Sequence, residues 1–433
     1  MRFASTRDAQ LQLGLSDTLA QGLAADGGLF VPLAWPNFPH SALTAPANDQ
    51  PLAGLAEDLL RPFLDGDVLA PELAAITGEA FNFPAPQYWL DAEQRLGVLE
   101  LFHGPTAAFK DFGARFLAAA LTRLRRNATR TLQVLVATSG DTGGAVAAAF
   151  HRRPGIEVAV LYPKGLVSPT QQQQLTCWGD NVRSFAVRGR FDDCQRMVKQ
   201  AFQDVALRER YELTSANSIN LGRLLPQMAY YWASSLRILR EHGEPASFVI
   251  PSGNLGNVTA CVWARKLGAP IAAVVLAHNA NRTVPDYLSS GTLRTRASVA
   301  TLSSAMDVGD PSNLERLSAL FPDAASLRGA VSAVSIDDDA TRNRIRTDFA
   351  RYGRIWCPHT AVAAEAHARL APSLRQRGRW LVVATAHAAK FRETVAPLIG
   401  ESVPMPENLA RLFDRPSHAM EIDPDVEALR QAL

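Results

Sequence analysis

The amino-acid sequence predicts an α/β protein built on mainly parallel sheets. From about residue 93 onward, short runs rich in β-branched residues alternate with Ala-rich runs of helical periodicity. Small or Gly-rich loops follow several of the apolar runs, as expected where a strand passes into a helix. The 433 residues, 47% hydrophobic and 20% charged, have the composition of a globular protein with one large domain or two to three smaller ones.

Residues 1–92 follow a different pattern, in which helical pieces such as 52–60 are separated by prolines. The turn-rich stretch 26–32 is typical of a loop with a strand, and the polar stretch 41–50 is typical of a connection. We therefore expect an N-terminal helical layer ahead of the α/β region.

The α/β region contains six apolar runs that we expect to be strands: 132–137, 157–162, 181–187, 247–250, 271–277 and 380–384. Apolar residues recur at helical spacing between them, in 143–150, 194–205, 224–239 and 258–267. Pro226 is compatible with the first turn of its helix, and Gly268 is a suitable residue to end the last one. Strands that alternate with helices in this way favour parallel sheets covered by helices.

The bulk properties exclude several classes of partner. The net charge is +2 and the isoelectric point about 8.4, so no nucleic-acid or membrane-surface partner is expected. The start lacks an apolar signal core, and no run of about 18 apolar residues occurs. The four cysteines lie far apart and form no CxxC pair, so we expect free thiols in a reducing cytoplasm, with no disulfide and no metal site.

Lys110 lies between aromatic residues where a loop passes into an amphipathic helix. The stretch 101–115 reads LFHGPTAAFKDFGAR, with Phe109 directly before the lysine and Phe112 shortly after it. A lysine amine shielded from water can act as a nucleophile or bond covalently to a carbonyl group. The spacing alone also fits a lysine stem that packs under a solvated amine, which is the commoner case.

Two loops after predicted strands have the character of anion sites, because α/β sheets bind ligands at the carboxyl ends of their strands. ATSGDTGGA (137–145) opens an Ala-rich helix, and Ser139 and Thr142 add hydroxyl donors, although a simple helix cap is the alternative. IPSGNLGN (250–257) also precedes a helix, and Gly253 and Gly256 allow a ligand close to the backbone, although an ordinary turn is the alternative.

A third loop, VATAHAAK (383–390), places the hydroxyl group of Thr385 at the end of a predicted strand. For His387 and Lys390 in the same loop we expect solvated or helix-capping side chains without a role in the site.

A shielded lysine and two anion sites together suit pyridoxal 5′-phosphate. The cofactor needs a lysine amine for its covalent bond and an anchor for its phosphate, and the second anion site would serve a phosphorylated substrate. This chemistry is a hypothesis that the spacing of the residues does not settle.

The same motifs resemble those of the threonine synthase family, which has the fold of type II pyridoxal-phosphate enzymes. LFHGPTAAFKDFGARF is similar to the family's cofactor-lysine motif, and ATSGDTGGAVA, LTSANSINLGRLLPQ, PSGNLGNVTA, AMDVGDPSN and TAHAAKF follow in the family's order. The resemblance extends from about residue 5 to about residue 400. It implies two open, twisted, mainly parallel-sheet domains with the active site between them.

The resemblance also implies a role for each matching residue. Lys110 would bind the cofactor covalently and carry protons, Thr385 would meet the pyridine nitrogen, and Asp141 would lie near the 3′-oxygen, where related enzymes have asparagine. The residues implied for the cofactor phosphate are Gly253, Asn254, Leu255, Gly256 and Asn257, the last of which replaces an aspartate. The residues implied for the substrate loop and the substrate phosphate are Ser139, Thr142, Asn217 and Arg223.

The activity implied is the last step of threonine biosynthesis, the conversion of O-phospho-L-homoserine and water into L-threonine and phosphate by γ-elimination and β-hydration. One alternative is a threonine or serine dehydratase of the same fold, whose substrate carries no phosphate for the second anion site. Another is a non-catalytic phosphate-binding paralogue, although the retention of Lys110 argues against it.

Three domains are expected: an N-terminal domain over 1–92, a large cofactor-binding domain over 93–130 and 236–433, and a smaller mobile domain over 131–235. We expect a monomer or homodimer that acts on a small-molecule substrate.

Overall fold

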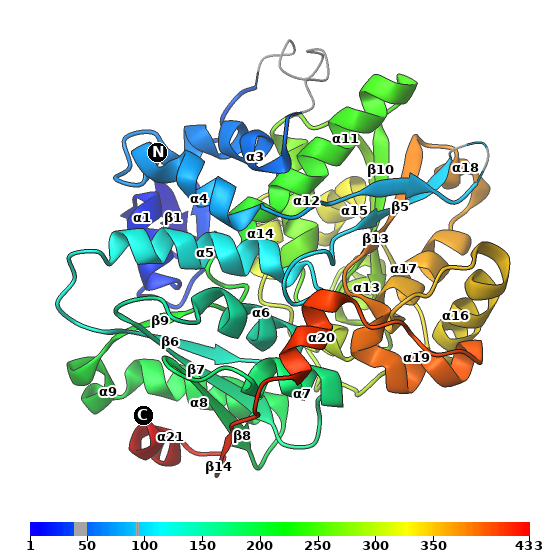
Figure 1. Ribbon diagram of the computed structural model, residues 1–433. Coiled ribbons are helices and arrows are strands. Elements are labelled where there is room, and N and C mark those ends of the chain that lie inside the picture. The colour runs from blue at the N-terminus through cyan, green and yellow to red at the C-terminus, as the bar shows by residue number, and fades with distance from the viewer. Residues whose placement is uncertain (39–49, 92, 94) are drawn as a thin grey trace.

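A computed structural model of the chain describes residues 1–38, 50–91, 93 and 95–433. Two sheets with helices packed against them form separate lobes, and the N-terminal elements pack beside helix α5 (Lys110–Leu124) (Figure 1). The connection expected at 41–50 lies outside the described residues, apart from Gln50.

The larger sheet has six strands in the order β12-β11-β10-β13-β5-β4. Their bounds are β12 Ser332–Ser335, β11 Ile271–His278, β10 Ala246–Pro251, β13 Arg379–Ala384, β5 Leu96–Glu100 and β4 Gln87–Trp89. Every pairing is parallel except that of β4 with β5. The predicted strands 247–250, 271–277 and 380–384 are confirmed and lie side by side in this sheet.

The smaller sheet has five parallel strands in the order β14-β8-β7-β6-β9. Their bounds are β14 Met420–Ile422, β8 Val182–Val187, β7 Ile156–Pro163, β6 Leu132–Ala137 and β9 Glu212–Ser215. The predicted strands 132–137, 157–162 and 181–187 are confirmed. The last strand comes from the C-terminal end of the chain, which thus returns to this sheet, with helix α21 (Val426–Ala432) beside helix α8 (Figure 1).

Helices connect the parallel strands, as the alternating pattern predicted. In the smaller lobe these are α6 Asp141–Phe150, α7 Pro169–Thr176, α8 Phe191–Gln203 and α9 Val205–Arg210. The segment predicted as one helix over 224–239 is divided among three consecutive helical elements. These are the α-helix α10 Leu221–Leu224, the 3-10 helix η3 Leu225–Gln227, which contains Pro226, and the α-helix α11 Met228–His242.

The remaining helices of the larger lobe follow in chain order. They are α12 Gly256–Lys266, α13 Thr283–Ser290, η4 Ser304–Met306, α14 Leu314–Ser318, α15 Ala324–Ala330, α16 Asp338–Tyr352, α17 Pro358–Ala368, α18 Pro372–Arg375, η5 Ala388–Phe391, α19 Arg392–Ile399 and α20 Glu407–Phe413.

The N-terminal layer contains a small sheet as well as the expected helices. Strands β1 (Phe3–Ser5), β2 (Gln12–Leu13) and β3 (Phe30–Pro32) pair antiparallel in the order β2-β1-β3. The helical elements are α1 Leu15–Gln21, α3 Leu52–Leu60, η1 Arg61–Leu64, η2 Ala70–Glu72 and α4 Leu73–Ala80. The predicted helix over 52–60 and the strand within 26–32 are both confirmed.

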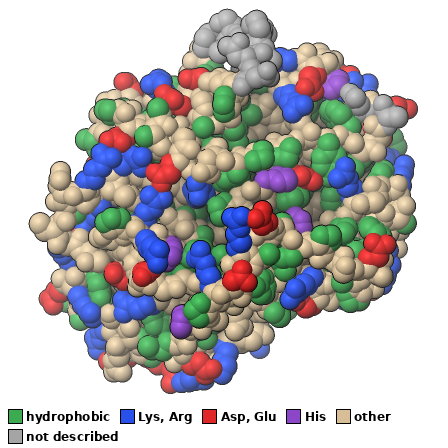
Figure 2. Space-filling view, viewed as in Figure 1, with side chains coloured by type: hydrophobic (Ala, Val, Ile, Leu, Met, Phe, Trp, Pro, Cys, Tyr) green, Lys and Arg blue, Asp and Glu red, His purple; other side chains and the backbone are tan. Residues whose placement is uncertain are grey.

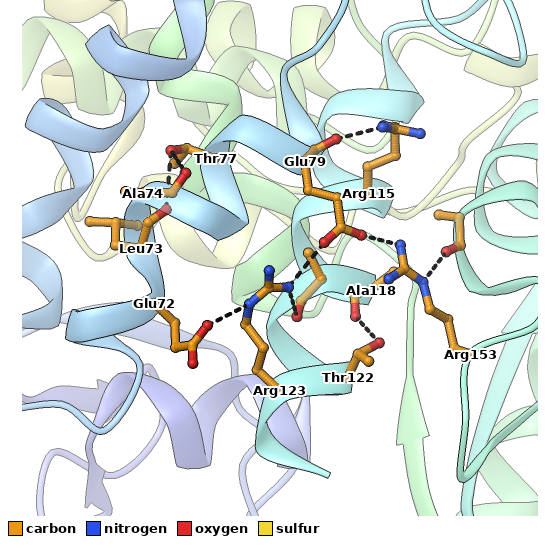
Figure 3. Close-up of polar contacts among 12 residues, drawn as sticks. Glu72, Leu73, Ala74, Thr77, Glu79, Arg115, Ala118, Thr122, Arg123 and Arg153 are labelled. Atoms are coloured by element: carbon orange, nitrogen blue, oxygen red, sulfur yellow. Dashed lines mark hydrogen bonds and ion pairs between the residues drawn. The ribbon is translucent and has the colours of Figure 1, made fainter. Parts of the chain in front are cut away.

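An ionic cluster joins this layer to the helix that begins at Lys110 (Figure 3). The guanidinium of Arg123 on α5 lies 3.0 Å from the carboxylate of Glu72 and 3.0 Å from that of Glu79 on α4. Glu79 also pairs with Arg153, which follows α6, and its carbonyl accepts a hydrogen bond from Arg115. Helix α5 is thus fixed between the N-terminal layer and the smaller lobe.

Charges of both signs are interspersed over the face shown in Figure 2. Among the described residues, no helix combines the length and the apolar character that crossing a bilayer would need.

Candidate active site

Lys110 follows a tight loop that Asp111 closes. The carboxylate of Asp111, which is buried, accepts hydrogen bonds from the backbone N–H of Thr106 at 2.9 Å and from its hydroxyl group at 2.7 Å. A Cβ atom on Gly104 would lie 2.5 Å from this carboxylate, so the loop needs glycine there. These contacts fix the direction in which the chain enters α5 and hence the place of Lys110.

The same loop is attached to the end of strand β13. The backbone N–H of Phe109 donates to the carbonyl of Thr385 at 2.9 Å, and Ala108 and Ala386 form an isolated antiparallel bridge. Thr385, which follows strand β13, therefore lies next to the residue that precedes Lys110.

The amine of Lys110 is held in surroundings that disfavour its charge. One contact works the other way: its Nζ lies 4.6 Å from the centre of the Phe109 ring, which attracts a cation. Burial, and then the positive charge of Arg223, lower the pKa of Lys110 to about 8. A large fraction of the amine is therefore uncharged near neutral pH, as a base or nucleophile must be.

Helix α12 presents its N-terminus to the same place without a capping side chain. Leu255 precedes the helix in a left-handed conformation, with φ 62°, and makes no side-chain cap. The first N–H groups of a helix have no acceptor within it and carry the positive end of its dipole. A Cβ atom on Gly253 would lie 2.8 Å from the Cα of Met306, so only glycine lets the loop pass this close.

Asn257 adds a side-chain donor beside these amides. Its Oδ1 accepts hydrogen bonds from the hydroxyl groups of Tyr230 at 2.5 Å and Tyr231 at 2.9 Å. Its Nδ2 is buried and has no partner in the described part of the chain. A buried donor without an acceptor is costly, so this amide is suited to bind a ligand oxygen.

One cavity collects most of the candidate residues. Its lining includes Lys110, Asp141, Arg223, Gly253, Asn254, Leu255, Gly256, Asn257 and Thr385. It is narrow, about 60 Å³, and two larger cavities of about 600 and 520 Å³ lie elsewhere in the larger lobe. Chemistry and not size identifies the site, because the shielded amine and the uncapped helix meet only in the narrow cavity.

Arg223 lies at the wall of this cavity and keeps one donor unused. Its guanidinium donates to the carbonyl of Ala216 and, at 3.5 Å, to that of Lys110. Its Nε is buried and has no partner among the residues that the structure describes. Burial lowers the pKa of Arg223 to about 10, which leaves the group positively charged near neutral pH.

Three of the residues expected at the substrate, Ser139, Thr142 and Asn217, are not in the cavity lining. Ser139 and Thr142 flank Asp141 at the start of α6 and are partly exposed. Asn217 donates from Nδ2 to the carbonyl of Ala137 at 2.8 Å and so joins the ends of β6 and β9.

The cavity lining also includes residues that were not predicted, and those with polar side chains are Ser218, Gln227 and His359. The hydroxyl oxygen of Ser218 accepts from the amides of Asn254 at 2.6 Å and Asn313 at 3.2 Å. His359 Nε2 accepts from the N–H of Ala305 at 3.1 Å, and burial lowers the pKa of this histidine to about 4. Ser218 stands in the SANSIN motif and could have been chosen there, whereas no pattern distinguishes His359.

The expectation for Lys390 was wrong. Its side chain is fully buried, and its Nζ lies 2.9 Å from the carboxylate of Asp141. The loop 385–391 folds inward between the two lobes, where water cannot reach the amine. His387, in contrast, caps the following turn as expected, with Nδ1 accepting from the N–H of Ala389.

The donor set fits pyridoxal 5′-phosphate. The uncapped start of α12 and the unpartnered amide of Asn257 suit a phosphate, the shielded amine of Lys110 suits a covalent bond to an aldehyde, and the hydroxyl of Thr385 suits a ring nitrogen.

Comparison with known proteins agrees with this chemistry. Residues 92–386 match the model of the pyridoxal-phosphate dependent enzyme family, residues 2–81 that of the threonine synthase N terminus, and residues 360–433 that of the threonine synthase C-terminal region. The chain is 39% identical to a threonine synthase of Haemophilus influenzae and 37% identical to one of Escherichia coli, in each case over 100% of this chain and 99% of the relative.

Solved structures show the same likeness. Threonine synthase from Escherichia coli superposes with a TM-score of 0.89 at 36% identity, over 100% of this chain and 99% of that one. A pyridoxal-phosphate-bound threonine synthase from Brucella melitensis superposes with a TM-score of 0.90 at 32% identity, over 100% and 98%. Maize serine racemase, at a TM-score of 0.53 and 15% identity over 77% of this chain and 92% of that one, shares the fold alone.

Proposed function

Because the chain belongs to the threonine synthase family of pyridoxal-phosphate-dependent enzymes, we propose that Lys110 is both the covalent anchor of its cofactor and its proton carrier. The protein is an enzyme with threonine synthase activity, and its cofactor is pyridoxal 5′-phosphate. The observation that supports the roles proposed below is the juxtaposition, in one cavity, of the Lys110 amine, the uncapped start of α12 and the guanidinium of Arg223.

The cofactor would be held at its phosphate and its ring. The N–H groups of residues 253–257 and the Nδ2 of Asn257 would bind the phosphate, the hydroxyl of Thr385 would meet the ring nitrogen, and Asp141 would lie near the 3′-oxygen. When bound, pyridoxal phosphate withdraws electrons from the bonds at the α-carbon of the substrate. A neutral hydroxyl at Thr385, unlike a carboxylate, does not favour protonation of the ring nitrogen.

Lys110 would move the protons of the reaction. O-phospho-L-homoserine loses phosphate from its γ-carbon, and water then adds at the β-carbon to give L-threonine. The uncharged amine of Lys110 would take the proton from the α-carbon, assist in removing one from the β-carbon, and return a proton afterwards. The lowered pKa of the amine supports this role, because an ordinary lysine would already be protonated.

Arg223 would bind the phosphate of the substrate. Its unpartnered Nε and its charge suit an oxyanion better than any other group of the wall. Ser139, Thr142 and Asn217 lie on the neighbouring ends of β6 and β9 and would reach the same phosphate when the smaller domain moves toward the larger one.

A product analysis with purified protein and pyridoxal 5′-phosphate tests the proposed reaction. With O-phospho-L-homoserine we expect phosphate and threonine in equal amounts, and with L-threonine we expect no keto acid. Keto acid formation would instead indicate a dehydratase, and the absence of all products would indicate a phosphate-binding protein without catalysis.

Arg223→Met provides the matching test of the substrate phosphate site. Loss of one charged hydrogen-bond partner should raise the KM for O-phospho-L-homoserine about 10- to 100-fold. Arg237→Met is the control, because Arg237 lies on the exposed side of α11 and pairs only with Glu241 among the described residues. An unchanged KM in Arg223→Met would exclude this residue as the phosphate ligand.

We further propose that the enzyme works in the cytoplasm as a monomer or homodimer, with the three domains given above and strand β14 added to the smaller one. Its four cysteines, all buried and unpaired, support a reducing compartment.

A further inference from the structure

A second lysine, Lys390, lies fully buried beside the active-site cavity, and the reaction above does not use it. Its Nζ lies 2.9 Å from the Oδ1 of Asp141 and 2.9 Å from the carbonyl oxygen of Thr106, in the loop before Lys110. The chain has five lysines, and the other three are exposed. Burial of a lysine charge is costly, so its place here needs a reason.

The two oxygens of the Asp141 carboxylate have different surroundings. Oδ1 takes the contact from Lys390 and a hydrogen bond from the Nε2 of Gln171 at 2.9 Å. Oδ2 takes no hydrogen bond within the described parts of the chain, and Asp141 lines the cavity of Lys110. The ion pair therefore orients the carboxylate and leaves one oxygen for the cavity.

Lys390 also decides the charge of this carboxylate. Burial by itself would raise the pKa of Asp141, but Lys390 foremost, then His359 and the hydrogen bond from Gln171, outweigh it, so that the pKa lies below its usual value. If the amine were removed, the carboxylate would be a buried charge without an ionic partner, which favours its protonated form.

We propose that Lys390 is a positioning residue that keeps Asp141 ionised and oriented beside Lys110 and the 3′-oxygen of the cofactor. The ionised carboxylate favours a positive charge on the Lys110 nitrogen and disfavours a negative charge on the neighbouring ring oxygen. Both effects raise the pH at which the proton shared by the Lys110 nitrogen and the ring oxygen is lost. This role rests on the proposed function of Lys110.

The other ionisable groups around the pair do not obscure this effect. His359 is buried and His387 is partly buried, which lowers the pKa of each to about 4, so both are neutral above pH 6. Burial raises the pKa of Cys357 above its usual value. Arg223 stays charged, with a pKa lowered by burial to about 10.

Asp111 also lies near Lys390, beyond Thr106. Burial raises the pKa of Asp111, but the residue keeps its two hydrogen bonds from Thr106 in any variant of Lys390. Between about pH 6 and pH 9, the group expected to titrate beside Asp141 is therefore Lys110, free or bound to the cofactor.

The direction in which the pH midpoint of the visible band shifts in Lys390→Met distinguishes this role from a purely structural one. After burial and Arg223, the next largest influence on the pKa of Lys110 is Asp141, whose negative charge raises it. Lys390 has a smaller influence and lowers it. If Lys390→Met leaves Asp141 neutral, the pH midpoint of the visible absorption band of the holoenzyme falls. If Asp141 stayed ionised without Lys390, only a positive charge would be lost and the midpoint would rise.

The test is a pH titration of the visible band of the holoenzyme without substrate. We expect the midpoint of Lys390→Met to fall by about 1 pH unit, and that of Lys390→Arg to stay near the wild-type value. Asp141→Asn and the double variant Asp141→Asn/Lys390→Met should share one lowered midpoint, because Lys390 without its partner loses its own charge. This comparison also keeps the test valid if Lys390→Met alone does not fold.

Lys199→Met, which removes an exposed lysine on α8, should leave the midpoint unchanged. An unchanged or raised midpoint in Lys390→Met, even with reduced thermal stability, would overturn the role of Lys390. So would a midpoint of Asp141→Asn below that of the double variant. The absence of any visible band in the wild-type protein would instead contradict the proposed function itself.

Discussion

Lys110 can serve as a base near neutral pH because its surroundings remove the charge of its amine. Burial removes water that would stabilise the ammonium form, and the buried guanidinium of Arg223 repels its positive charge. The exposed lysines of the chain have no such surroundings.

Uptake of pyridoxal 5′-phosphate by the cofactor-free protein reports this pKa. Only the uncharged amine attacks an aldehyde, so the rate should rise about tenfold per pH unit below pH 8 and level off above it. Stopped-flow absorbance between pH 6 and pH 10 measures the rate. A rate that still increased at pH 10 would mean that Lys110 titrates as an ordinary lysine.

Asn257 connects the proposed phosphate site to two buried tyrosines, and its removal should be costly. Asn257→Leu leaves the hydroxyl groups of Tyr230 and Tyr231 without the acceptor they share, although Tyr230 also donates to Gln227. We expect the free energy of unfolding of the cofactor-free protein to fall by about 3 kcal/mol in urea titrations.

A second substitution checks the cause of that loss. Adding Tyr231→Phe to Asn257→Leu removes one of the stranded hydroxyl groups and should recover about 1 kcal/mol. If the double variant were less stable than Asn257→Leu, the loss would come from packing and not from the unpaired hydroxyl groups.

Among the elements, α5 and α10 approach so closely that only glycine fits between them. A Cβ atom on Gly113 would lie 2.4 Å from the carbonyl oxygen of Arg223. Gly113→Ala should therefore displace α10, lower the free energy of unfolding by about 2 kcal/mol, and raise the KM for O-phospho-L-homoserine because Arg223 moves with the helix.

Gly78→Ala on α4 is the matched control. Its Cβ would meet no atom within 4 Å, and alanine favours a helix, so stability should stay equal or rise by up to about 1 kcal/mol. Equal KM values for the two alanine variants and the wild type would show that the contact of α5 with α10 does not position Arg223.

The elements that could be predicted are those whose own residues decide their structure. The strand 132–137 is fully buried and rich in Val and Leu, so its sequence alone indicates a central strand. Helix α16 was not predicted, because its buried positions, Thr341, Ile345 and Asp348, include two polar residues and no apolar stripe. Strand β14 has three residues, two of them exposed, and exists only because β8 offers an edge.

The same limit applies to the site. Lys110 and the Gly-rich loop at 253–257 stand in motifs that a single stretch of sequence displays. Lys390 and His359 are buried by segments far away along the chain, so no local pattern distinguishes them from surface residues.

For the whole molecule, Arg316 is one connection between the N-terminal layer and the cavity of Lys110. This fully buried guanidinium donates to the carbonyl of Phe30 on β3 at 3.0 Å. It also donates to the carbonyls of Ser218 at 3.0 Å and Ile219 at 2.6 Å, in the loop that lines the Lys110 cavity. The N-terminal layer thus supports the loop that contributes Ser218 to the Lys110 cavity.

Arg316→Met should weaken stability and cofactor binding together. It leaves one buried and two partly buried carbonyl groups without this donor, so we expect a loss of about 3 kcal/mol in unfolding and a higher Kd for pyridoxal 5′-phosphate. Arg7→Met, which breaks only the exposed pair with Glu315, should cost less than about 1 kcal/mol and leave the Kd unchanged. A normal Kd in Arg316→Met would mean that the N-terminal layer does not support the site.

The covalent attachment of the cofactor at Lys110 is the central claim, and one measurement tests it directly. The holoenzyme is treated with borohydride, which makes a lysine–cofactor bond permanent, and the modified peptide is located by mass spectrometry. Because Lys390 lies close to Lys110, the experiment has a clear alternative outcome. We expect the cofactor on Lys110 alone and none on Lys390; cofactor on Lys390, or on neither lysine, would contradict the claim.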